Sequence, residues 1–479
     1  KEFKGAYSGE HGDGLVRSEW IAPFFGPRLT AALGEIKSWL DPRGLMNPGK
    51  IVDPPKMDTR ELFRFKPGYA TQARSTALDW SEWGGYDKAV EMCNNNGHCR
   101  KFDAGTMCPS YRATRNERDL TRGRANTLRL ALSGQLGDEG EQAVKEGLDL
   151  CVSCKGCKRE CPTGVDMARM KVEFLAQYRR THPPTLRERA VAYLPRYAPW
   201  ATRLAPIANL GAKLLKTTLG FAPSRELPRW RGDPFPTLER SDADVVLFVD
   251  TFNRYFEPEN PRAALAVLEA AGYRVHAPGP ICCGRTFLSA GLVDEAKREA
   301  RRFVDTLKPY AERGVPIVGL EPSCLFSLRD EFEVLLPEGG LFAGKAFLFE
   351  EFLAQNLDRL KFRETRKKVL LHGHCHQKAF DAMPAVEKLL RHVPGVEVST
   401  VQTSCCGMAG SFGYEAEHYE VSMKMAELAL LPAVRDARDA LLVADGTSCR
   451  AQIAHGTGRA AVHIARFLES AISAPRAGS

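Results

Sequence analysis

The hydrophobic pattern of the second half of the chain occurs twice. Each copy begins with a short apolar run that suits a buried strand, continues through helical patterns and includes a second strand. In the first copy these segments are Val245–Val249, Pro261–Ala271, Asp294–Arg313 and Val315–Leu320. In the second they are Val369–Leu371, Ala385–His392, Glu415–Ala437 and Ala440–Ala444. This order predicts two α/β units with parallel sheets, at residues 241–355 and 356–470.

The first half has a different organisation. An amphipathic helix is expected near Pro27–Leu40, in a segment that ends by residue 56, and a cysteine-rich section follows at 57–180. Residues 181–240 are expected to form a basic, Pro-rich linker. Its apolar and basic stretch, Ala190–Phe221, could lie on a membrane surface, although packing onto neighbouring domains is favoured. Residues 471–479 are expected to be a disordered tail.

Composition and charge narrow the function classes. The net charge is +8, from 67 basic and 59 acidic residues, but no basic repeat interleaved with aromatics points to nucleic acid. No apolar run is long enough to span a membrane, and the start at Lys1 resembles neither a signal peptide nor a chain beginning. Fourteen cysteines in a long chain do not suit a secreted disulfide scaffold. A reducing cytoplasm is the expected compartment.

Four cysteines have the spacing of a bacterial ferredoxin. Cys151, Cys154, Cys157 and Cys161 are separated by two, two and three residues, and Pro162 follows the last. This spacing wraps backbone N–H groups around a 4Fe-4S cluster, with the fourth thiolate ligating a second cluster. Zinc is the alternative, although it usually requires two separated pairs of cysteines. The spacing therefore predicts iron–sulfur chemistry.

A partner motif lies upstream, at Cys93, Cys99 and Cys108-Pro109. Crossed ligation predicts that Cys108 completes the cluster of Cys151, Cys154 and Cys157. Cys161 would then join Cys93 and Cys99, where Asn96 stands in place of the missing ligand. That second site could hold a three-iron cluster, hold a four-iron cluster with a ligand such as His98, or have lost its cluster.

The two α/β copies carry matching cysteines. Cys282-Cys283-Gly284 and Cys324 in the first correspond to Cys405-Cys406-Gly407 and Cys449 in the second. Only the second has a further cysteine, Cys375, because Phe252 occupies the equivalent position. A further iron–sulfur cluster is the preferred interpretation of the second set, and a thiol–disulfide site is the alternative. Cysteines of the first set could instead be inert core residues. His372, His374 and His376 could supply a ligand or a proton.

These motifs resemble the iron–sulfur subunits of glycolate oxidase and anaerobic glycerol-3-phosphate dehydrogenase. Those proteins join an α-helical ferredoxin to two cysteine-rich CCG domains, which are related to heterodisulfide reductase subunits. The resemblance covers about residues 80–470 and includes both CCG triplets, His374-Cys375-His376 and Gly446-Thr447-Ser448-Cys449. It implies an α+β multidomain fold with two heterodisulfide-reductase-like domains. Ligation by all fourteen cysteines is the corresponding expectation.

Residues 1–56 resemble the end of the C-terminal domain of FAD-linked D-2-hydroxyacid dehydrogenases, through Ser8–Gly14 and Asn47-Pro48-Gly49-Lys50. The resemblance implies that Glu10 binds a divalent metal (Zn or Mn) and that His11 is the catalytic base. It also places Asn47 near the cofactor. The flavin-binding part itself is absent from the sequence. We therefore expect this chain to be unable to hold FAD or oxidise substrate without a flavoprotein domain or subunit.

The resulting hypothesis is an electron relay within an oxidoreductase. A D-2-hydroxy acid (D-lactate, glycolate or D-2-hydroxyglutarate) would reduce the flavin, and clusters would pass single electrons to quinone or a carrier protein. The location would be cytoplasmic, with peripheral contact to the inner face of the cell membrane. The alternatives are a heterodisulfide-reductase-like thiol/disulfide protein and a metal-stabilised binding module without catalysis.

Overall fold

The computed structural model describes residues 5, 11–61, 63–72, 74–103 and 105–473, in two compact units, Lys1–Thr71 and Gln72–Ser479. The first unit contains α1 (Gly14–Arg17), α2 (Ile21–Phe25) and α3 (Pro27–Leu40). Helix α3 begins and ends at the residues that the sequence predicted. Pro27 stands in its first turn, where a missing N–H costs no hydrogen bond. Beyond its end, the Asp41 carboxylate accepts hydrogen bonds from the backbone N–H groups of Leu45 and Met46, at 3.0 and 2.8 Å.

The second unit starts with a helical section built from short helices and cysteine-bearing loops. Its helices are α4 (Tyr86–Glu91), α5 (Pro109–Thr114), α6 (Thr121–Leu132), α7 (Gly140–Asp149), α8 (Gly156–Glu160) and α9 (Met167–Tyr178). The segment expected to be a linker contains three more: α10 (Leu186–Ala192), α11 (Leu194–Arg203) and α12 (Ala205–Leu215). Thr185 and Glu188 form a capping box at the start of α10, a local signal for a helix that the high Pro and Arg content obscures.

Both α/β repeats contain a parallel sheet, as predicted. The first sheet has the order β2-β1-β3-β4 and the second has β6-β5-β7. The strands are β1 (Val245–Phe248), β2 (Val275–His276), β3 (Ile317–Gly319), β4 (Ala346–Leu348), β5 (Lys367–Leu371), β6 (Val396–Thr400) and β7 (Leu441–Val443). In register, Val246 lies opposite Ile317 and Val369 opposite Leu441. Because all strands run the same way, the loops after them meet at one edge of each sheet.

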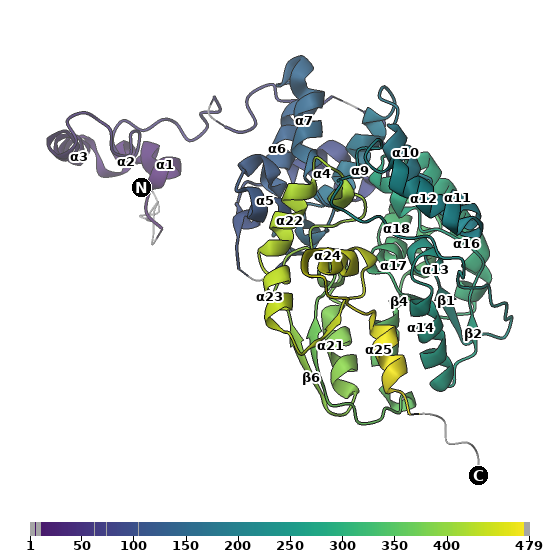
Figure 1. The fold of residues 1–479 in the computed structure, drawn as a ribbon. Coiled ribbons are helices and arrows are strands. Elements are labelled where there is room, and N and C mark those ends of the chain that lie inside the picture. Colours follow the sequence, from purple (N-terminus) through teal and green to yellow (C-terminus); the bar gives the residue numbers. More distant parts are fainter. Residues whose placement is uncertain (1–4, 6–10, 62, 73, 104, 474–479) are drawn as a thin grey trace, which may run out of the picture. The chain divides into compact units, whose positions relative to one another are not determined.

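The repeats are completed by helices that connect these strands. In the first repeat they are α13 (Thr251–Tyr255), α14 (Glu259–Ala270), α15 (Arg285–Ser289), α16 (Val293–Glu312), α17 (Pro322–Leu325), α18 (Glu331–Leu335) and α19 (Phe349–Ala354). In the second they are α20 (Cys375–Ala379), α21 (Met383–His392), α22 (Tyr419–Glu427), α23 (Leu430–Asp436), α24 (Thr447–Thr457) and α25 (Ile464–Ala471). Figure 1 shows the helical section at the end of the repeats where α13, α17 and α24 follow their strands.

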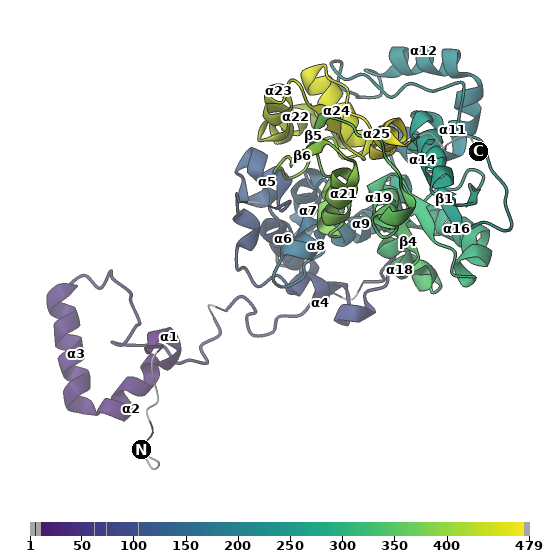
Figure 2. The same cartoon turned by 90° about the horizontal axis from the view of Figure 1, so that it is seen from below.

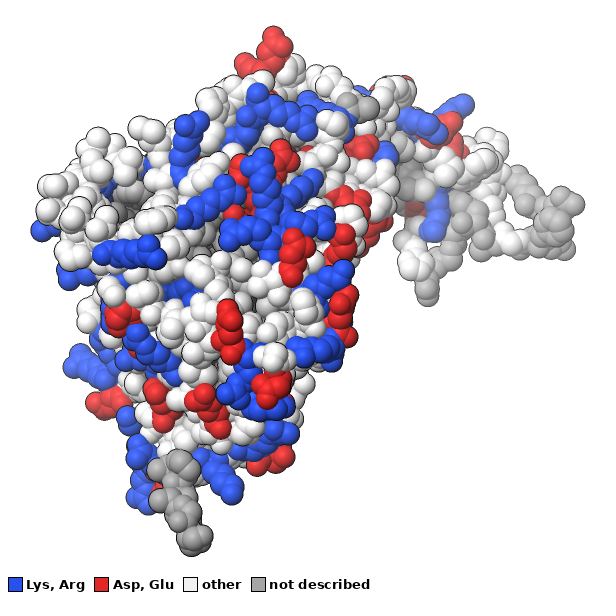
Figure 3. All heavy atoms as spheres, turned by 90° about the vertical axis from the view of Figure 1, so that its right-hand side faces the viewer, with Lys and Arg blue, Asp and Glu red and all other residues white. Residues whose placement is uncertain are grey.

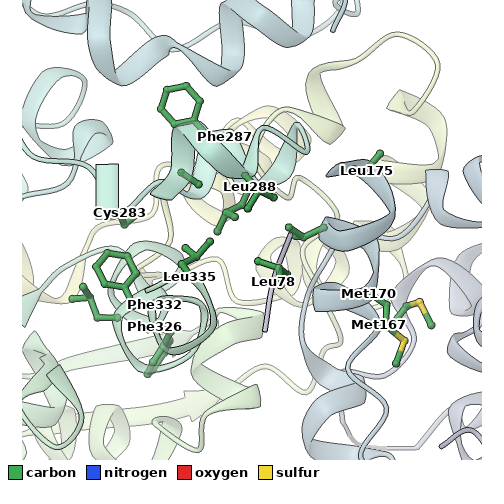
Figure 4. Close-up of a cluster of buried hydrophobic side chains, with 14 of the residues drawn as sticks. Leu78, Met167, Met170, Leu175, Cys283, Phe287, Leu288, Phe326, Phe332 and Leu335 are labelled. Carbon is green, nitrogen blue, oxygen red and sulfur yellow. The ribbon is translucent and has the colours of Figure 1, made fainter. Parts of the chain in front are cut away.

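One hydrophobic core joins the helical section to the first repeat. Leu78 and Leu175 belong to the same buried cluster as Leu288 and Leu335 (Figure 4). The approach is close at Gly291, because a Cβ there would lie 2.6 Å from the Leu175 Cβ. Gly291 also has a φ of +76°, which favours glycine. The helical section and the repeats therefore form one packed body rather than modules on a flexible linker.

The helices α11 and α12 lie at an outer edge of this body (Figure 2). Ile207, Leu210 and Leu214 share one face of α12, by their spacing of three and four residues, and each is more than half exposed. The packing expected for this stretch is therefore incomplete. Figure 3 shows Lys and Arg side chains distributed among uncharged areas on this side of the molecule. Among the residues that the structure describes, no helix is both long and apolar enough to cross a membrane.

Candidate metal centres

Four cysteines of the helical section surround one cavity. Cys108, Cys151, Cys154 and Cys157 line it together with Arg124, and each thiol is buried. The loop that carries three of them turns tightly because Ser153 and Lys155 adopt positive φ angles of 49° and 59°. These are the four residues that crossed ligation groups at one cluster. The arrangement fits a cluster held by four thiolates, although ligation itself stays a prediction.

Arg124 supplies positive charge at this cavity. Its side chain is 2% exposed and donates hydrogen bonds to the Cys108 sulfur (3.4 Å), the Ser110 hydroxyl (2.8 Å) and the Gly147 carbonyl (2.8 Å). Burial alone would lower the pKa of Arg124, but negative charge on Cys151 and Cys108 outweighs burial and raises it. A buried cation bonded to a ligand thiolate is suited to stabilise the anionic, reduced form of a cluster.

Burial makes two of the thiols around this cavity hard to ionise without a metal. Burial raises the pKa of Cys154 and of Cys157 above the ordinary thiol value. A protonated thiol is a poor ligand, so metal binding and proton release must occur together. The donor set of four buried thiols with a nearby guanidinium therefore fits an iron–sulfur cluster better than a site for a hard cation.

The second set of the ferredoxin motif is more open. Cys93 and Cys99 are buried, and burial raises the pKa of Cys99 to about 11, with smaller contributions from charge on Cys108 and Cys93. Cys161 is partly exposed at the end of α8, with its sulfur 3.4 Å from the Thr163 hydroxyl. Glu160, its neighbour, accepts a hydrogen bond from the Thr106 N–H at 2.6 Å and pairs with Lys101 at 2.9 Å.

Those contacts hold the segment after Cys99 against the end of α8, as joint ligation by Cys93, Cys99 and Cys161 requires. Asn96, which stands at the missing ligand position, accepts a hydrogen bond from the backbone N–H of His98.

The second α/β repeat gathers its cysteines at the carboxyl edge of its sheet. Cys375 follows β5, Cys405 and Cys406 follow β6, and Cys449 follows β7. All four are buried. Contact with the Cys406 thiol, together with burial, raises the pKa of Cys449. The order of the strands, β6-β5-β7, brings together loops that are far apart in sequence.

Two of the three nearby histidines have structural roles. His374 caps α20 by accepting a hydrogen bond from the His376 N–H at 3.1 Å. The His376 ring nitrogen lies 3.1 Å from the carbonyl of Ser153 in the ferredoxin loop. His372 differs, because its ligand nitrogen lies within 4.8 Å of the sulfurs of Cys406 and Cys449.

The first repeat holds three thiols in a corresponding place. Hydrogen bonds from Cys282 and Cys324 lower the pKa of Cys283, which lies between them. Arg285 follows in the chain and pairs with Glu331 at 2.7 Å. Phe252, at the position of the missing cysteine, lies in α13 and stacks on Phe256. This set therefore has fewer donors than that of the second repeat.

The ferredoxin cavity lies against both repeats. Charges on Cys375 and Cys405 contribute, after burial, to the raised pKa of Cys154. On the other side, buried Lys155 pairs with Asp330 and, at 2.5 Å, with Glu331 of the first repeat. The thiols of the ferredoxin cavity and of the second repeat therefore adjoin each other, and the first repeat contacts the same ferredoxin loop through Lys155.

The residues expected at a flavin site lie in the first unit. Glu10 is outside the described residues. His11 is exposed. Asn47 adopts a positive φ of 47°, and its side-chain oxygen accepts a hydrogen bond from Lys50 at 3.3 Å. These positions are described within that unit alone, so catalysis by His11, a metal at Glu10 and cofactor binding by Asn47 stay predictions.

Sequence reasoning missed Arg124, Lys155 and Glu160. Each is a charged residue near a cysteine motif, but charged residues near loops are common and usually exposed. The burial of Arg124 and Lys155 and the contacts of the partly buried Glu160 make them informative only once the structure is known. A second group of potential ligands, Glu415, Glu417 and His418, is explained by ion pairs, since His418 bonds both Glu415 and Asp149 at 2.8 Å.

Comparison with known families matches three kinds of domain along the chain. Residues 1–51 match the C-terminal domain of FAD linked oxidases, and residues 89–165 match the 4Fe-4S dicluster domain. The Cysteine-rich domain (CCG) matches twice, at 246–329 and 369–454. The chain thus joins the end of a flavin-enzyme domain to an iron–sulfur module and two CCG domains, as its motifs predict.

Curated relatives match long stretches of the chain. The chain is 28% identical to D-2-hydroxyglutarate dehydrogenase of Escherichia coli, over 95% of this chain and 51% of the relative. It is 27% identical to one of the subunits of anaerobic glycerol-3-phosphate dehydrogenase from the same organism, over 65% of this chain and 83% of the relative. It is 26% identical to the E. coli glycolate oxidase iron-sulfur subunit, over 81% of this chain and 95% of the relative.

The chain thus spans about half the length of the D-2-hydroxyglutarate dehydrogenases that it matches. Its similarity to iron–sulfur subunits of dehydrogenases supports an oxidoreductase role in electron transfer. The disulfide-reductase alternative is not favoured by these relatives.

Proposed function

We propose that this chain is the electron-transfer part of a flavin-dependent D-2-hydroxyacid dehydrogenase. Its relatives along nearly the whole chain are D-2-hydroxyglutarate dehydrogenases, which makes a D-2-hydroxy acid of this class the proposed electron donor. The flavin would be held by a separate domain or subunit, with His11 and Glu10 as parts of its substrate site. Bound iron–sulfur clusters supply one-electron carriers between a two-electron flavin and its acceptor.

The observation that carries this proposal is the contiguity of two cysteine sites. Cys154, which lines the ferredoxin cavity, belongs to the same buried cluster as Cys375, Cys405 and Cys449. The His376–Ser153 contact at 3.1 Å and the hydrogen bond from the Ser404 hydroxyl to the Thr106 carbonyl fix these loops against each other. Rigid placement of adjacent centres is what a relay needs. A metal-stabilised binding module would not require it.

The relay is tested on the anaerobically purified chain, with iron and sulfide analysis and stepwise reduction. About eight irons, uptake of more than one electron and EPR signals broadened by neighbouring paramagnets are the expected results. Reoxidation by a water-soluble quinone analogue, faster than by a small redox protein such as a ferredoxin, would support quinone as the acceptor. A chain that contains zinc without iron, or iron that cannot be reduced, would exclude the relay.

We further propose that quinone access occurs at an anionic membrane, through the exposed face of α11 and α12. The segment 194–216 contains four basic residues and no acidic residue. Trp200, Leu204, Ile207 and Leu214 are 57–69% exposed. Arg196 pairs with Glu295 and Glu299, so the exposed Arg203 and Lys213 are the basic residues placed to meet lipid. Exposed apolar side chains beside such residues suit the boundary of an anionic bilayer, where each contributes about 1 kcal/mol.

Membrane contact is tested by flotation with vesicles of phosphatidylglycerol and phosphatidylcholine. Ile207→Asp and Leu214→Asp should each reduce binding to anionic vesicles at least fivefold. Leu428→Asp is the matched control, because Leu428 is 50% exposed in the second repeat. Equal binding to neutral vesicles, or variants that bind normally, would contradict the proposal. A shift from dimer to monomer in Ile207→Asp, without vesicle binding by the original chain, would assign the face to a second copy instead.

A further inference from the structure

A second cavity lies at the carboxyl edge of the first sheet, where α11 meets the loops that follow β1 and β2. Its volume is about 150 Å³. Its lining includes Pro195 and Pro199 of α11, Thr251 and Tyr255 of α13, and Cys282. It shares no residue with the cavity of the ferredoxin cysteines, so it is a separate site.

The size and the walls of this cavity suit a single ring. Pockets for drug-sized ligands measure roughly 300–1,000 Å³, whereas a cavity of about 150 Å³ holds one benzene ring. The space is therefore too small for a whole flavin or nucleotide. Pro195, Pro199 and Ile281 supply apolar walls against which the faces of a ring can pack.

Two hydroxyl groups at this cavity are available to a ligand. Thr251 and Tyr255 stand four residues apart on α13, so their side chains share one face of the helix. None of the described residues forms a hydrogen bond with either hydroxyl. Burial raises the pKa of Tyr255, so its hydroxyl stays protonated near neutral pH and can donate a hydrogen bond to a carbonyl oxygen.

The start of α13 is held in place by its cap. The Asp250 carboxylate accepts hydrogen bonds from the backbone N–H groups of Phe252 and Asn253, at 2.9 and 3.2 Å. Since α11 also packs on α13, the two hydroxyls are placed by well-ordered neighbours. A ligand would therefore meet donors whose positions are already set.

The charged groups around the cavity neutralise one another. Arg196 pairs with Glu295 and Glu299, at 2.6 and 2.8 Å, and Arg302 pairs with Glu299 at 3.2 Å. Arg254, which is buried, donates hydrogen bonds to two backbone carbonyls. Because these arginines are engaged by carboxylates or by the backbone, the cavity favours an uncharged ligand over an anion.

The cavity also adjoins the core that contains the ferredoxin cysteines. Cys282 lies in its lining, and the next residue, Cys283, belongs to the same buried cluster as Cys108, Cys151 and Cys157. A ring bound in the cavity would therefore lie against the part of the protein through which the relay is proposed to run.

We propose that this cavity binds the ring of a quinone and that Thr251 and Tyr255 donate hydrogen bonds to its carbonyl oxygen. This inference rests on the proposed function, because it gives the acceptor of the relay a site. The reduced iron–sulfur clusters pass two electrons to the ring, one at a time, and are themselves oxidised. Two protons from water complete the conversion of quinone to quinol. The helix α11 connects the cavity to the face proposed to meet the membrane, from which a lipid-soluble quinone would enter.

Binding is tested with duroquinone, which has the ring and no long tail, by equilibrium dialysis against the oxidised chain. Tyr255→Phe should weaken binding about tenfold, since one hydrogen bond is lost. Thr251→Trp should abolish saturable binding, because the indole fills the cavity. Tyr273→Phe is the matched control and should bind as the original chain does. Tyr273 is a buried tyrosine of the same repeat that lies outside the cavity and packs against Phe352.

Electron transfer to the ring is tested on the dithionite-reduced chain. Reoxidation by duroquinone should slow at least tenfold in Thr251→Trp and Tyr255→Phe. Reoxidation by ferricyanide, a hydrophilic oxidant that needs no ring site, should keep its original rate in both variants. Unchanged iron content and EPR signals would establish that the clusters are intact.

The proposal is overturned if the original chain shows no saturable binding of duroquinone. It is also overturned if both variants bind duroquinone and are reoxidised by it as the original chain is, a result that would leave the relay standing. Tyr255-dependent binding by a chain whose iron cannot be reduced would support the cavity as a ring site and count against the relay alone.

Discussion

Removal of the Arg124 charge should lower the reduction potential of the cluster that Cys108, Cys151, Cys154 and Cys157 are proposed to hold. The guanidinium lies 3.4 Å from the Cys108 sulfur and is buried. At this distance and an effective dielectric constant of about 20, two unit charges interact with about 5 kcal/mol. The added electron is spread over a whole cluster, so less than half of this, about 2 kcal/mol, is expected to remain.

For a one-electron couple, about 2 kcal/mol corresponds to roughly 80 mV. Arg124→Gln should therefore shift the midpoint potential downward by roughly that amount, because the reduced cluster is more negative and loses its cation. Arg124→Lys keeps the charge and should lie nearer the original value. The assay is an anaerobic redox titration followed by EPR, with iron analysis to establish that each variant retains its cluster.

Arg254→Gln is the burial-matched control. Arg254 is 3% exposed and donates to the carbonyls of Phe235 and Pro278, at 2.8 and 2.7 Å, in the first repeat. Its loss should reduce stability without moving the potential. If Arg124→Gln retained its iron and titrated at the original potential, electrostatic tuning by Arg124 would be refuted. An equal shift in Arg254→Gln would point to general loosening of the fold instead.

Three further predictions concern the same region. Cys154→Ser should lose the absorbance of the first cluster, and full absorbance would contradict its ligand role. Burial would lower the pKa of His418, but hydrogen bonds and charge from Asp149 and Glu415 outweigh burial and raise it from 6.5 to about 9. The ion pairs of His418 therefore stabilise the folded chain fully below pH 6.5, and this stabilisation is lost as the pH rises through 9. Because Asp149 is 42% exposed, His418→Gln should lower the free energy of unfolding in urea by only about 1 kcal/mol at about pH 6 and should not change it at about pH 10. An equal loss of stability at both pH values would contradict a role for the ion pair. Lys155→Met leaves Asp330 with Lys158, at 2.7 Å, as its remaining cation and should cost at most about 3 kcal/mol in the same assay, whereas unchanged stability would show that Lys155 is dispensable.

Much of the fold could be predicted from local pattern. The helix Pro27–Leu40 and strands such as Val245–Phe248 follow from hydrophobic spacing that needs no tertiary information. The duplication predicted the parallel sheets, and parallel strands explain why cysteines after separate strands meet at one edge. The grouping of Cys108 with Cys151 was predictable because crossed ligation is a property of the spacing itself.

The rest of the fold and of the site depends on tertiary contacts, which no periodic pattern in the sequence indicates. Lys155 and Asp330 are 175 residues apart, and nothing near either one marks the other as its partner. Composition favoured a linker at 181–240 because the segment is rich in Pro and Arg, yet Pro195 and Pro206 stand in first turns, where proline is compatible with a helix. His372 and His374 look equivalent in sequence. Only the direction in which each ring points separates a helix cap from a candidate ligand.

The two repeats differ in the donors that they carry and in the buried clusters to which their cysteines belong. Cys283 of the first repeat belongs to the core that also contains Leu175 and Phe287, so its surroundings join the helical section to the rest of the body. Cys449 of the second repeat belongs to the same buried cluster as Cys154, which lines the ferredoxin cavity. Phe252 removes a donor from the first repeat, while the second keeps four thiols and gains His372. Because Cys283 shares its buried cluster with Cys108, Cys151 and Cys157, both copies pack against the helical section that carries the ferredoxin cavity, and they differ in the number of donors that they place there.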